Sequence, residues 1–444
     1  MIKEKILILW ENERKFLITI FFLSLILKLL YIFMVEGINT HPGVDGVFYD
    51  KVALNVARGY GFVTSPGDYG TEKPPIYVFL IGLLYYIFGH NYGAIRIVQA
   101  ILSGVICIFT YLIGKKVKNE NIGKIASFLV ALDPFLTQLS AWYLSQILYI
   151  TFEIIAIYFI VKMEEEFSWG KAFITGLLLG LSSLTMSYSS PFFYPFILLW
   201  SFLVFKGNAK NIGKSFGTIA LVLTLTISVW TIRNYIIFKE FIPIGTASGL
   251  RFWGGNNPRA KGVWVPWSGS SRFYFSAGEP GWGDAGDWSD WASQAGSPWL
   301  NLQFGKSGGL TRNERDMRYW LMGWKWIKKH PADYLILSCK KFITFWQYWN
   351  PLTTLPRPNR LWRNIGKMYY YPLLVFFLIG IIYNLSAWKK LTTLYIFILH
   401  SITGALVFFG DAGQRAPITP VLWIIAAAGL AEIYPGIKEK LWRL

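Results

Sequence analysis

The sequence predicts an all-α, polytopic membrane protein. Of its 444 residues, 54% are hydrophobic and 15% are charged, whereas about 25% are charged in a typical soluble domain. Apolar runs recur along the chain, and several of them reach the roughly 17–25 residues that cross a bilayer core. We expect about 10–12 transmembrane helices, with about ten as the central count. The predicted spans are residues 16–35, 94–114, 122–139, 147–163, 172–186, 191–205, 216–232, 372–385, 391–409 and 417–431.

Lysine and arginine concentrate in short loops between the apolar runs, as they do in the cytoplasmic loops of membrane proteins. This bias predicts that residues 36–74 and 233–331 lie on the extracytoplasmic side. The stretch 75–89 is too short to span the membrane and 332–349 mixes charged with apolar residues, so both are expected at the interface. The predicted organisation is a catalytic transmembrane module (1–232), an external Trp- and Gly-rich region (233–331) and a C-terminal transmembrane module (332–444), in the inner or plasma membrane.

The net charge of +18 does not indicate a nucleic-acid-binding protein. The basic residues flank apolar runs, where they set topology and attract anionic lipid headgroups. Cys107 and Cys339 do not look like a disulfide pair, and no metal-ligand spacing is present. We therefore expect membrane lipid, and no nucleic acid, among the partners.

Asp45 stands between Gly43 and Gly46, directly before a predicted amphipathic helix of the first external loop. Gly59 and Gly61 are expected to stop that helix. Asp45 has two interpretations. It caps the helix by accepting hydrogen bonds from its first amides, or it is a catalytic carboxylate.

The same loop ends in GTEKPPIYVFLIGLLYYIFG, which begins at Gly70. The loop brings Asp45, Arg58, Glu72 and Lys73 to one membrane face. A carboxylate that accepts a hydroxyl proton, beside cations that hold a phosphate, is the equipment for group transfer from a phosphate leaving group. The alternative interpretation of Glu72 and Lys73 is an ordinary interfacial charge pair. Within the spans, the rare charged residues Lys28, Asp133 and Glu153 are functional candidates because an ionisable group in hydrocarbon is costly.

Five stretches in order resemble the GT-C fold glycosyltransferases, and most of all the branch of the protein O-mannosyltransferases and lipid A aminoarabinose transferases. The similarity runs from about Asp45 to Leu430. After Asp45 and its helix, it is carried by GTEKPPIYVFLIGLLYYIFG, by RNYIIFKEFIPIGTASGLRFWGGNNP from Arg233, by KKHPADYL from Lys328 and by QRAPITPVLWIIAAAGL from Gln414. The chain departs from the family at Ser145-Gln146, where Thr-Glu or Ser-Glu is usual, and at Leu184-Thr185-Met186, where an Arg-Pro pair commonly follows Leu-Thr.

The resemblance implies an inverting hexosyl- or pentosyltransferase that uses a polyprenyl-phosphate-linked sugar donor and a lipid, glycan or protein acceptor. By the family's pattern, Asp45 would be the catalytic carboxylate. Lys73, Glu72 and Arg415 would lie at the donor phosphate, and Arg58 is added to that set from its place in the loop. Substrate contacts are expected from Arg233, Asn256, Asn257 and His330. No cofactor is certain, although related enzymes leave a divalent cation, Mg²⁺ or Mn²⁺, open.

Two other function classes stay open. An O-antigen ligase or polymerase would use a lipid diphosphate donor, and outer arginines that include Arg251, Arg259, Arg272 and Arg315 suit it. A transporter of lipid-linked glycans would need charged residues in the middle of its spans, and these are scarce. The Trp-rich segment 245–309 is read as an interfacial aromatic belt or as an acceptor-binding loop. Its Asp284, Asp287 and Asp290 lack the full calcium-loop pattern.

Overall fold

The computed structural model describes residues 12–65, 68–187, 190–264, 311–350, 355–356 and 358–433. Helices dominate this part of the chain, and one antiparallel pair of short strands joins them. In chain order the elements are α2 (Glu13–Tyr31), η1 (Ile32–Glu36), α3 (Val44–Ala57), β1 (Val63–Ser65), β2 (Asp68–Tyr69), α4 (Pro75–Phe88), α5 (Tyr92–Val117), α6 (Glu120–Leu132), α7 (Pro134–Ala141), α8 (Gln146–Met163), α9 (Trp169–Ser183), α10 (Ser190–Val204), α11 (Ala209–Phe238), α12 (Ser248–Gly255), α15 (Arg312–Lys329), α16 (Pro331–Trp346), α17 (Arg360–Tyr383), η3 (Trp388–Leu391), α18 (Thr392–Val407), α19 (Ala412–Arg415), η4 (Ala416–Ile418) and α20 (Thr419–Ile433).

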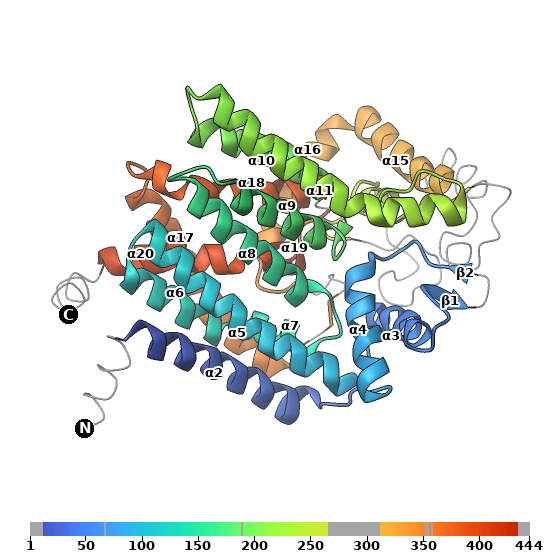
Figure 1. Cartoon of the computed structure of the whole chain (residues 1–444), viewed down its shortest axis with the longest axis horizontal. Helices are drawn as coiled ribbons and strands as arrows, with labels where there is room; N and C mark the ends of the chain where they lie inside the picture. The colour runs from blue at the N-terminus through green and yellow to red at the C-terminus, as the bar shows by residue number, and fades with distance from the viewer. Residues whose placement is uncertain are drawn as a thin grey trace.

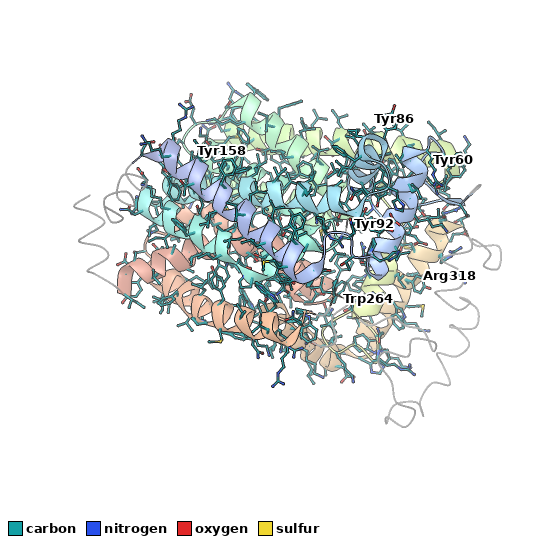
Figure 2. All side chains as sticks on the ribbon, turned by 90° about the horizontal axis from the view of Figure 1, so that it is seen from below. Tyr60, Tyr86, Tyr92, Tyr158, Trp264 and Arg318 are labelled. Atoms are coloured by element: carbon teal, nitrogen blue, oxygen red, sulfur yellow. The ribbon has the colours of Figure 1, made fainter. Side chains whose placement is uncertain are left out.

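The long helices run side by side and give the bundle two distinct ends (Figure 1). Helices α3 and α4, strands β1 and β2, and α15 gather at one end. Figure 2 shows the same division from another side, with Tyr60, Tyr92 and Arg318 at one end and Tyr158 of α8 at the other. The 26 residues of α5 extend about 39 Å, which exceeds the roughly 30 Å of a bilayer core.

Glycines let neighbouring helices approach closely. A Cβ on Gly114 of α5 would lie 2.8 Å from the Cα of Gly123 in α6, and a Cβ on Gly429 of α20 would lie 2.1 Å from the carbonyl oxygen of Phe376 in α17. In lipid, where apolar surface gains little from leaving the solvent, close packing of this kind drives helix association. Glycines therefore let α5 pack closely on α6, and α20 on α17.

The prediction of a polytopic all-α membrane protein is confirmed. Among the described helices, seven are long and apolar enough to cross a membrane, or eight if the bent pair α6–α7 is one span. This count is lower than the ten predicted, because α9 and α10 have 15 residues each and reach only about 22 Å. The predicted boundary at residue 232 falls within α11, and the division into three parts stays a prediction.

Two of the charged residues predicted within spans are held by structural hydrogen bonds. Asp133 accepts from the amides of Phe135 and Leu136 at 2.8 and 2.9 Å, and from Trp423 Nε1 at 2.7 Å. It therefore caps α7 at the point where the predicted span 122–139 bends by 51°. Lys28 Nζ donates to the carbonyl of Ala131 at 2.6 Å. The hydrogen bonds of Asp133 and Lys28 therefore stabilise the bend between α6 and α7.

Candidate functional site

The structure brings Asp45 and Lys73 into direct contact. Lys73 Nζ lies 3.0 Å from Asp45 Oδ1, and the ammonium also lies 5.5 Å from the centre of the Tyr49 ring. The Asp45 side chain is 55% exposed and that of Lys73 is 16% exposed. The pair is thus a partly covered ion pair whose carboxylate a ligand can reach.

Asp45 belongs to the first turn of α3, but Gly43 is the N-cap and no side chain caps this helix. The interpretation of Asp45 as a helix cap is therefore wrong, because Asp45 stands two residues after the N-cap and no side chain makes a capping hydrogen bond to this helix. The helix ends where predicted, since Gly59 and Gly61 both adopt φ of 80°. That conformation is strained for residues with a side chain.

Lys73 is fixed by the prolines that follow it. Pro74 is the N-cap of α4 and Pro75 is its first residue, where proline's fixed φ suits the helix and its missing N–H is not needed. The amide of Ile76 donates to the carbonyl of Leu184 at 3.1 Å. The backbone on the C-terminal side of Lys73 is thereby anchored to the bundle.

Electrostatics keep both members of the pair charged. The positive charge of Lys73 is the main cause that lowers the pKa of Asp45, and it outweighs desolvation. For Lys73, burial acts to lower the pKa, but Asp45 and Tyr49 together more than offset it and the pKa is raised. Asp45 is therefore an anion and Lys73 a cation over a wide range around neutral pH.

Arg251 is a third charged group at this site, and its charge acts on both Asp45 and Lys73. It is carried by α12, whose N-terminus is held by Asp316 of α15. Ser248 Oγ donates to Asp316 Oδ2 at 2.7 Å, and the amide of Gly249 donates to Asp316 Oδ1 at 2.8 Å. Sequence reasoning placed Arg251 only among the outer arginines of the ligase alternative. The signal available was its position four residues before the Gly-Asn-Asn-Pro turn.

Glu72 and Arg58 were both predicted at the donor phosphate, and their surroundings differ. Glu72 is half-buried and its charge acts on Arg315 of α15. Arg58 is exposed at the C-terminal end of α3, about 20 Å along the helix from Asp45. The structure therefore does not bring Arg58 to Asp45.

Arg233 and its neighbour Asn234 organise the segment that holds the loop of Lys73. Asn234 Nδ2 donates to the carbonyls of Ile242 and Ile244 at 3.0 and 3.3 Å. Two residues on, Thr246 bonds Thr71 through its amide (2.9 Å) and through its hydroxyl (2.8 Å). We call these four hydrogen bonds the Asn234–Thr71 clamp.

Arg233 itself joins α11 to the segment between α3 and β1. One guanidinium nitrogen donates to the carbonyl of Phe62 at 3.2 Å, another donates to Asn234 Oδ1 at 2.9 Å, and the group lies over the ring of Trp230 at 4.5 Å. The described contacts of Arg233 are therefore with a backbone carbonyl, the Asn234 side chain and aromatic rings of the protein itself.

A second network attaches α3 to the turn between α4 and α5. Asp50 Oδ1 accepts from Tyr85 OH at 2.6 Å and lies 2.7 Å from His90 Nε2. Tyr85 shares a further 2.5 Å hydrogen bond with Tyr143, and Tyr143 also packs against Gly46, where a Cβ would approach its side chain to 3.1 Å. Asp45 thus stands on a helix that is held at Gly46 and at Asp50.

The other predicted substrate residues, Asn256, Asn257 and His330, have described contacts with other residues of the protein. Asn256 is buried, donates to the carbonyls of Phe252 and Val407, and accepts from Lys341 Nζ at 2.7 Å. Asn257 closes the end of α12 by donating to Trp253 and accepting from the amide of Arg259. His330 is the N-cap residue of α16 and lies 3.5 Å from Asp333.

Arg415 is almost fully buried. Its Nη1 donates to the carbonyls of Phe345 and Gln347, each at 2.6 Å, and its guanidinium lies 4.3 Å from the centre of the Tyr370 ring. In this conformation the residue fastens α19 to the end of α16. Its assignment to a donor phosphate stays a prediction.

A metal site was left open by the sequence. Within the described residues, no group of three or more His, Cys, Asp or Glu side chains could hold a metal ion. Asp284, Asp287, Asp290 and Arg272 fall in residues 265–310, outside the described part of the chain, as does the Trp-rich segment from residue 265 onward.

Comparisons with known proteins match parts of this chain. Residues 72–231 match the model of the family described as dolichyl-phosphate-mannose-protein mannosyltransferase, a match to less than half of the chain. An uncharacterized protein of Aquifex aeolicus is 26% identical over 224 residues, which are 50% of this chain and 44% of that protein.

The solved structure of the oligosaccharyltransferase AglB from Archaeoglobus fulgidus, in complex with an inhibitory peptide and a dolichol-phosphate, superposes with a TM-score of 0.57. The identity is 13%, and the alignment covers 97% of this chain and 51% of AglB. AglB is a GT-C glycosyltransferase. The chain has the GT-C fold.

The GT-C fold assigned from the five sequence stretches is therefore confirmed. ArnT of Cupriavidus metallidurans aligns with 96% of the chain, but at a TM-score of 0.38 and 12% identity it adds nothing to the fold assignment. This GT-C chain spans about half the length of the relatives AglB and the Aquifex protein.

Proposed function

We propose that this GT-C chain is an integral membrane glycosyltransferase that takes a sugar from a polyprenyl-phosphate donor and passes it to an acceptor hydroxyl. The observation that carries the proposal is the 3.0 Å contact between Asp45 and Lys73 at the end of the bundle where α3 and α4 lie. A base and a phosphate-binding cation are the two groups that this transfer requires from the protein.

The choice of donor rests on charge and on the relatives. Lys73 and Arg251 offer two positive charges near one carboxylate. The phosphodiester of the donor carries one negative charge and the released polyprenyl phosphate up to two, and either competes with Asp45 for these cations. AglB was solved with a dolichol-phosphate, and the matching family model is named for a dolichyl-phosphate-linked mannose. Both support a polyprenyl-phosphate donor here.

The reaction is a single inverting displacement. The oxygen of the acceptor hydroxyl attacks the anomeric carbon, the bond between that carbon and the phosphate oxygen breaks, and the hydroxyl proton passes to Asp45. Lys73 and Arg251 stabilise the charge on the departing polyprenyl phosphate. The phosphate needs no added proton to leave, so a separate general acid is not part of this scheme.

We place the reaction on the extracytoplasmic face of the inner or plasma membrane. Helices α3 and α4 lie at the opposite end of the bundle from Tyr158 of α8. Lys162 and Lys171 flank the loop after α8, and lysines beside short loops favour the cytoplasmic side. The sugar, and whether the acceptor is lipid, glycan or protein, are questions for the assay below.

The decisive experiment uses purified protein in lipid nanodiscs with a panel of radiolabelled polyprenyl-phosphate sugars and a membrane extract as acceptor source. We expect one donor to lose its label with release of polyprenyl phosphate, and the Asp45→Asn variant to be inactive while still folded. If no donor on the panel is consumed but a lipid diphosphate donor is, the proposal fails in favour of a ligase or polymerase.

A further inference from the structure

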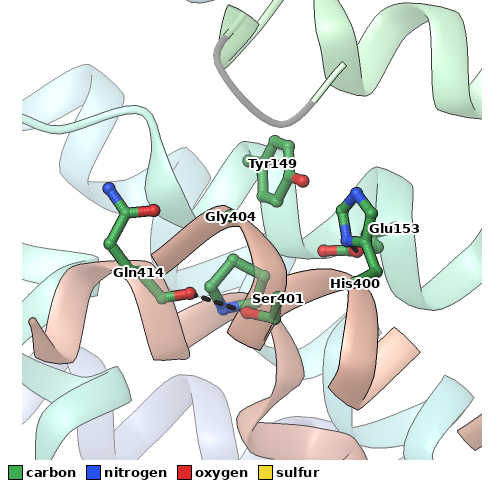
Figure 3. Close-up of a pocket in the computed structure, with 7 residues that line it drawn as sticks. Tyr149, Glu153, His400, Ser401, Gly404 and Gln414 are labelled. Carbon is green, nitrogen blue, oxygen red and sulfur yellow. Dashed lines mark hydrogen bonds and ion pairs between the residues drawn. The ribbon is translucent and has the colours of Figure 1, made fainter. Parts of the chain in front are cut away.

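Glu153 and His400 face each other inside the bundle, on α8 and α18 (Figure 3). Their side chains are 1% and 3% exposed, and Glu153 Oε1 lies 4.0 Å from His400 Nδ1. A cavity of about 10 Å³ opens between them and is also lined by Tyr149, Ser401 and Gln414. Neither the proposed sugar transfer nor the family pattern uses this pair.

No described residue donates a hydrogen bond to either carboxyl oxygen of Glu153. The distance of 4.0 Å to the imidazole is too long for a direct hydrogen bond. An ionised carboxylate in such a place would carry its full desolvation cost without compensation, and a buried group in that position takes up a proton instead. The geometry therefore favours the neutral carboxylic acid.

The surroundings of His400 keep bulk water away. The imidazole stacks on Phe193 with ring centres 4.5 Å apart and planes at 9°, and Phe196 meets it edge-on at 5.7 Å. The charged and titratable groups around the pair are few. Tyr149 lies on α8 with Glu153, while Arg415, next to Gln414, extends to the carbonyls at the end of α16.

The cavity has the size and polarity of a site for one water molecule. About 10–15 Å³ of space accessible to a water centre, with two to four polar partners, is enough to hold one. Glu153, His400, Tyr149 and Ser401 bring polar groups to its wall. A single bound water spans the 4.0 Å gap between the carboxyl and the imidazole, which a direct contact does not.

We propose that Glu153 and His400 form a buried proton site: Glu153 carries an exchangeable proton, and one water in the cavity connects its hydroxyl to neutral His400. The site joins α8 to α18 and, through the 2.9 Å hydrogen bond from Ser401 Oγ to the carbonyl of Gln414, to the α19 turn that carries Arg415.

Infrared difference spectroscopy on the purified protein tests this without any substrate. The spectrum of the wild type minus that of Glu153→Gln should contain the carbonyl stretch of a protonated carboxyl group, shifted in heavy water. The matched control is Glu165→Gln, which removes an exposed carboxylate that pairs with Lys116 and should change only carboxylate bands. Carboxylate bands in the Glu153 difference spectrum would mean that Glu153 is ionised and would overturn the proposal.

If Glu153→Gln does not fold, a second measurement with other variants tests the proposal. In His400→Asn the same carbonyl band should move, because the group at the far side of the bridging water has changed. An O–H stretch of the wild type that shifts in oxygen-18 water should be lost in Glu153→Leu or His400→Leu. An unshifted carbonyl band, or a water band unaffected in whichever of these variants folds, would refute the bridged pair. None of these outcomes bears on sugar transfer.

Discussion

Lys73 Nζ lies 3.0 Å from Asp45 Oδ1, although the two residues are 28 positions apart in the chain. The contact makes each group the counter-ion of the other. If Lys73 binds the donor phosphate as proposed, that phosphate competes with Asp45 for the ammonium, and the weakened ion pair makes the carboxylate a better proton acceptor. The first two predictions follow from this competition.

Replacing Lys73 by alanine should weaken binding of undecaprenyl phosphate to the purified protein by about 10-fold to 100-fold, as expected for a charged hydrogen bond worth about 1.5–3 kcal/mol. Titration with the lipid phosphate in nanodiscs, followed by intrinsic tryptophan fluorescence, measures it. Lys51→Ala is the matched control, because Lys51 is exposed on α3. Equal losses in both variants would argue against a specific role for Lys73.

Asp45→Asn should separate binding from turnover. Transfer should fall by at least about 100-fold because the base is gone, while undecaprenyl phosphate binds as tightly or more tightly because Lys73 no longer has an anionic partner. The two quantities are measured by the radiolabel assay and by the lipid titration. A variant that turns over at the wild-type rate would remove Asp45 from the mechanism.

We expect the buried Lys341 to make the free energy of unfolding depend on pH. Burial lowers its pKa to about 7, whereas a lysine in an unfolded chain has a pKa of about 10.4. Between these values the unfolded chain binds more protons than the folded chain, so the free energy of unfolding due to this group rises with pH from about 7 to about 10. Across this pH range the thermal unfolding midpoint of the wild type should rise relative to that of Lys341→Met.

Lys341→Met should also be less stable at the alkaline end, because it leaves Asn256 Oδ1 and the carbonyl of Leu406 without the donor that Lys341 Nζ supplies at 2.7 and 2.9 Å. Each such loss costs about 1–3 kcal/mol. The control is Lys340→Met, since Lys340 is the exposed neighbour on the same helix. Identical pH slopes for the two variants would contradict the assignment to Lys341.

The Asn234–Thr71 clamp should act on the donor through Lys73. Thr71→Val and Thr246→Val each remove one end of the 2.8 Å hydroxyl contact and should each weaken undecaprenyl phosphate binding by about 2-fold to 10-fold, the effect of a neutral hydrogen bond. Because both changes break one contact, the double variant should lose little more than either single one. Fully additive losses would show that the two residues act separately.

Labelling from one side of the membrane tests the orientation. In a chain with the exposed Cys339 replaced by serine, a cysteine at Arg58 should react from the outside of intact cells. A cysteine at Lys116 should react only from the other side of the membrane. Arg58 lies at the α3 end of the bundle, and Lys116 is in the last turn of α5 beside Glu165. Reaction of both from the same side would overturn the proposed topology.

The sequence by itself determined that this chain folds as membrane helices and roughly where each one lies. In hydrocarbon every backbone N–H and C=O must be satisfied within its own segment, so an apolar run of sufficient length has one available structure. The end of α3 at Gly59 and the start of α4 at Pro75 were predictable for the same kind of reason, since both depend on local backbone geometry.

Tertiary structure decided which charged side chains meet. Asp45 faces Lys73, Arg251 arrives from more than 170 residues away, and Arg58 lies on the same helix as Asp45 but at its other end. Likewise only the packing of α18 on α8 brings His400 to Glu153. Sequence spacing determines on which element a residue stands, but the distance between two elements depends on packing contacts that are spread over the whole bundle and leave no local pattern.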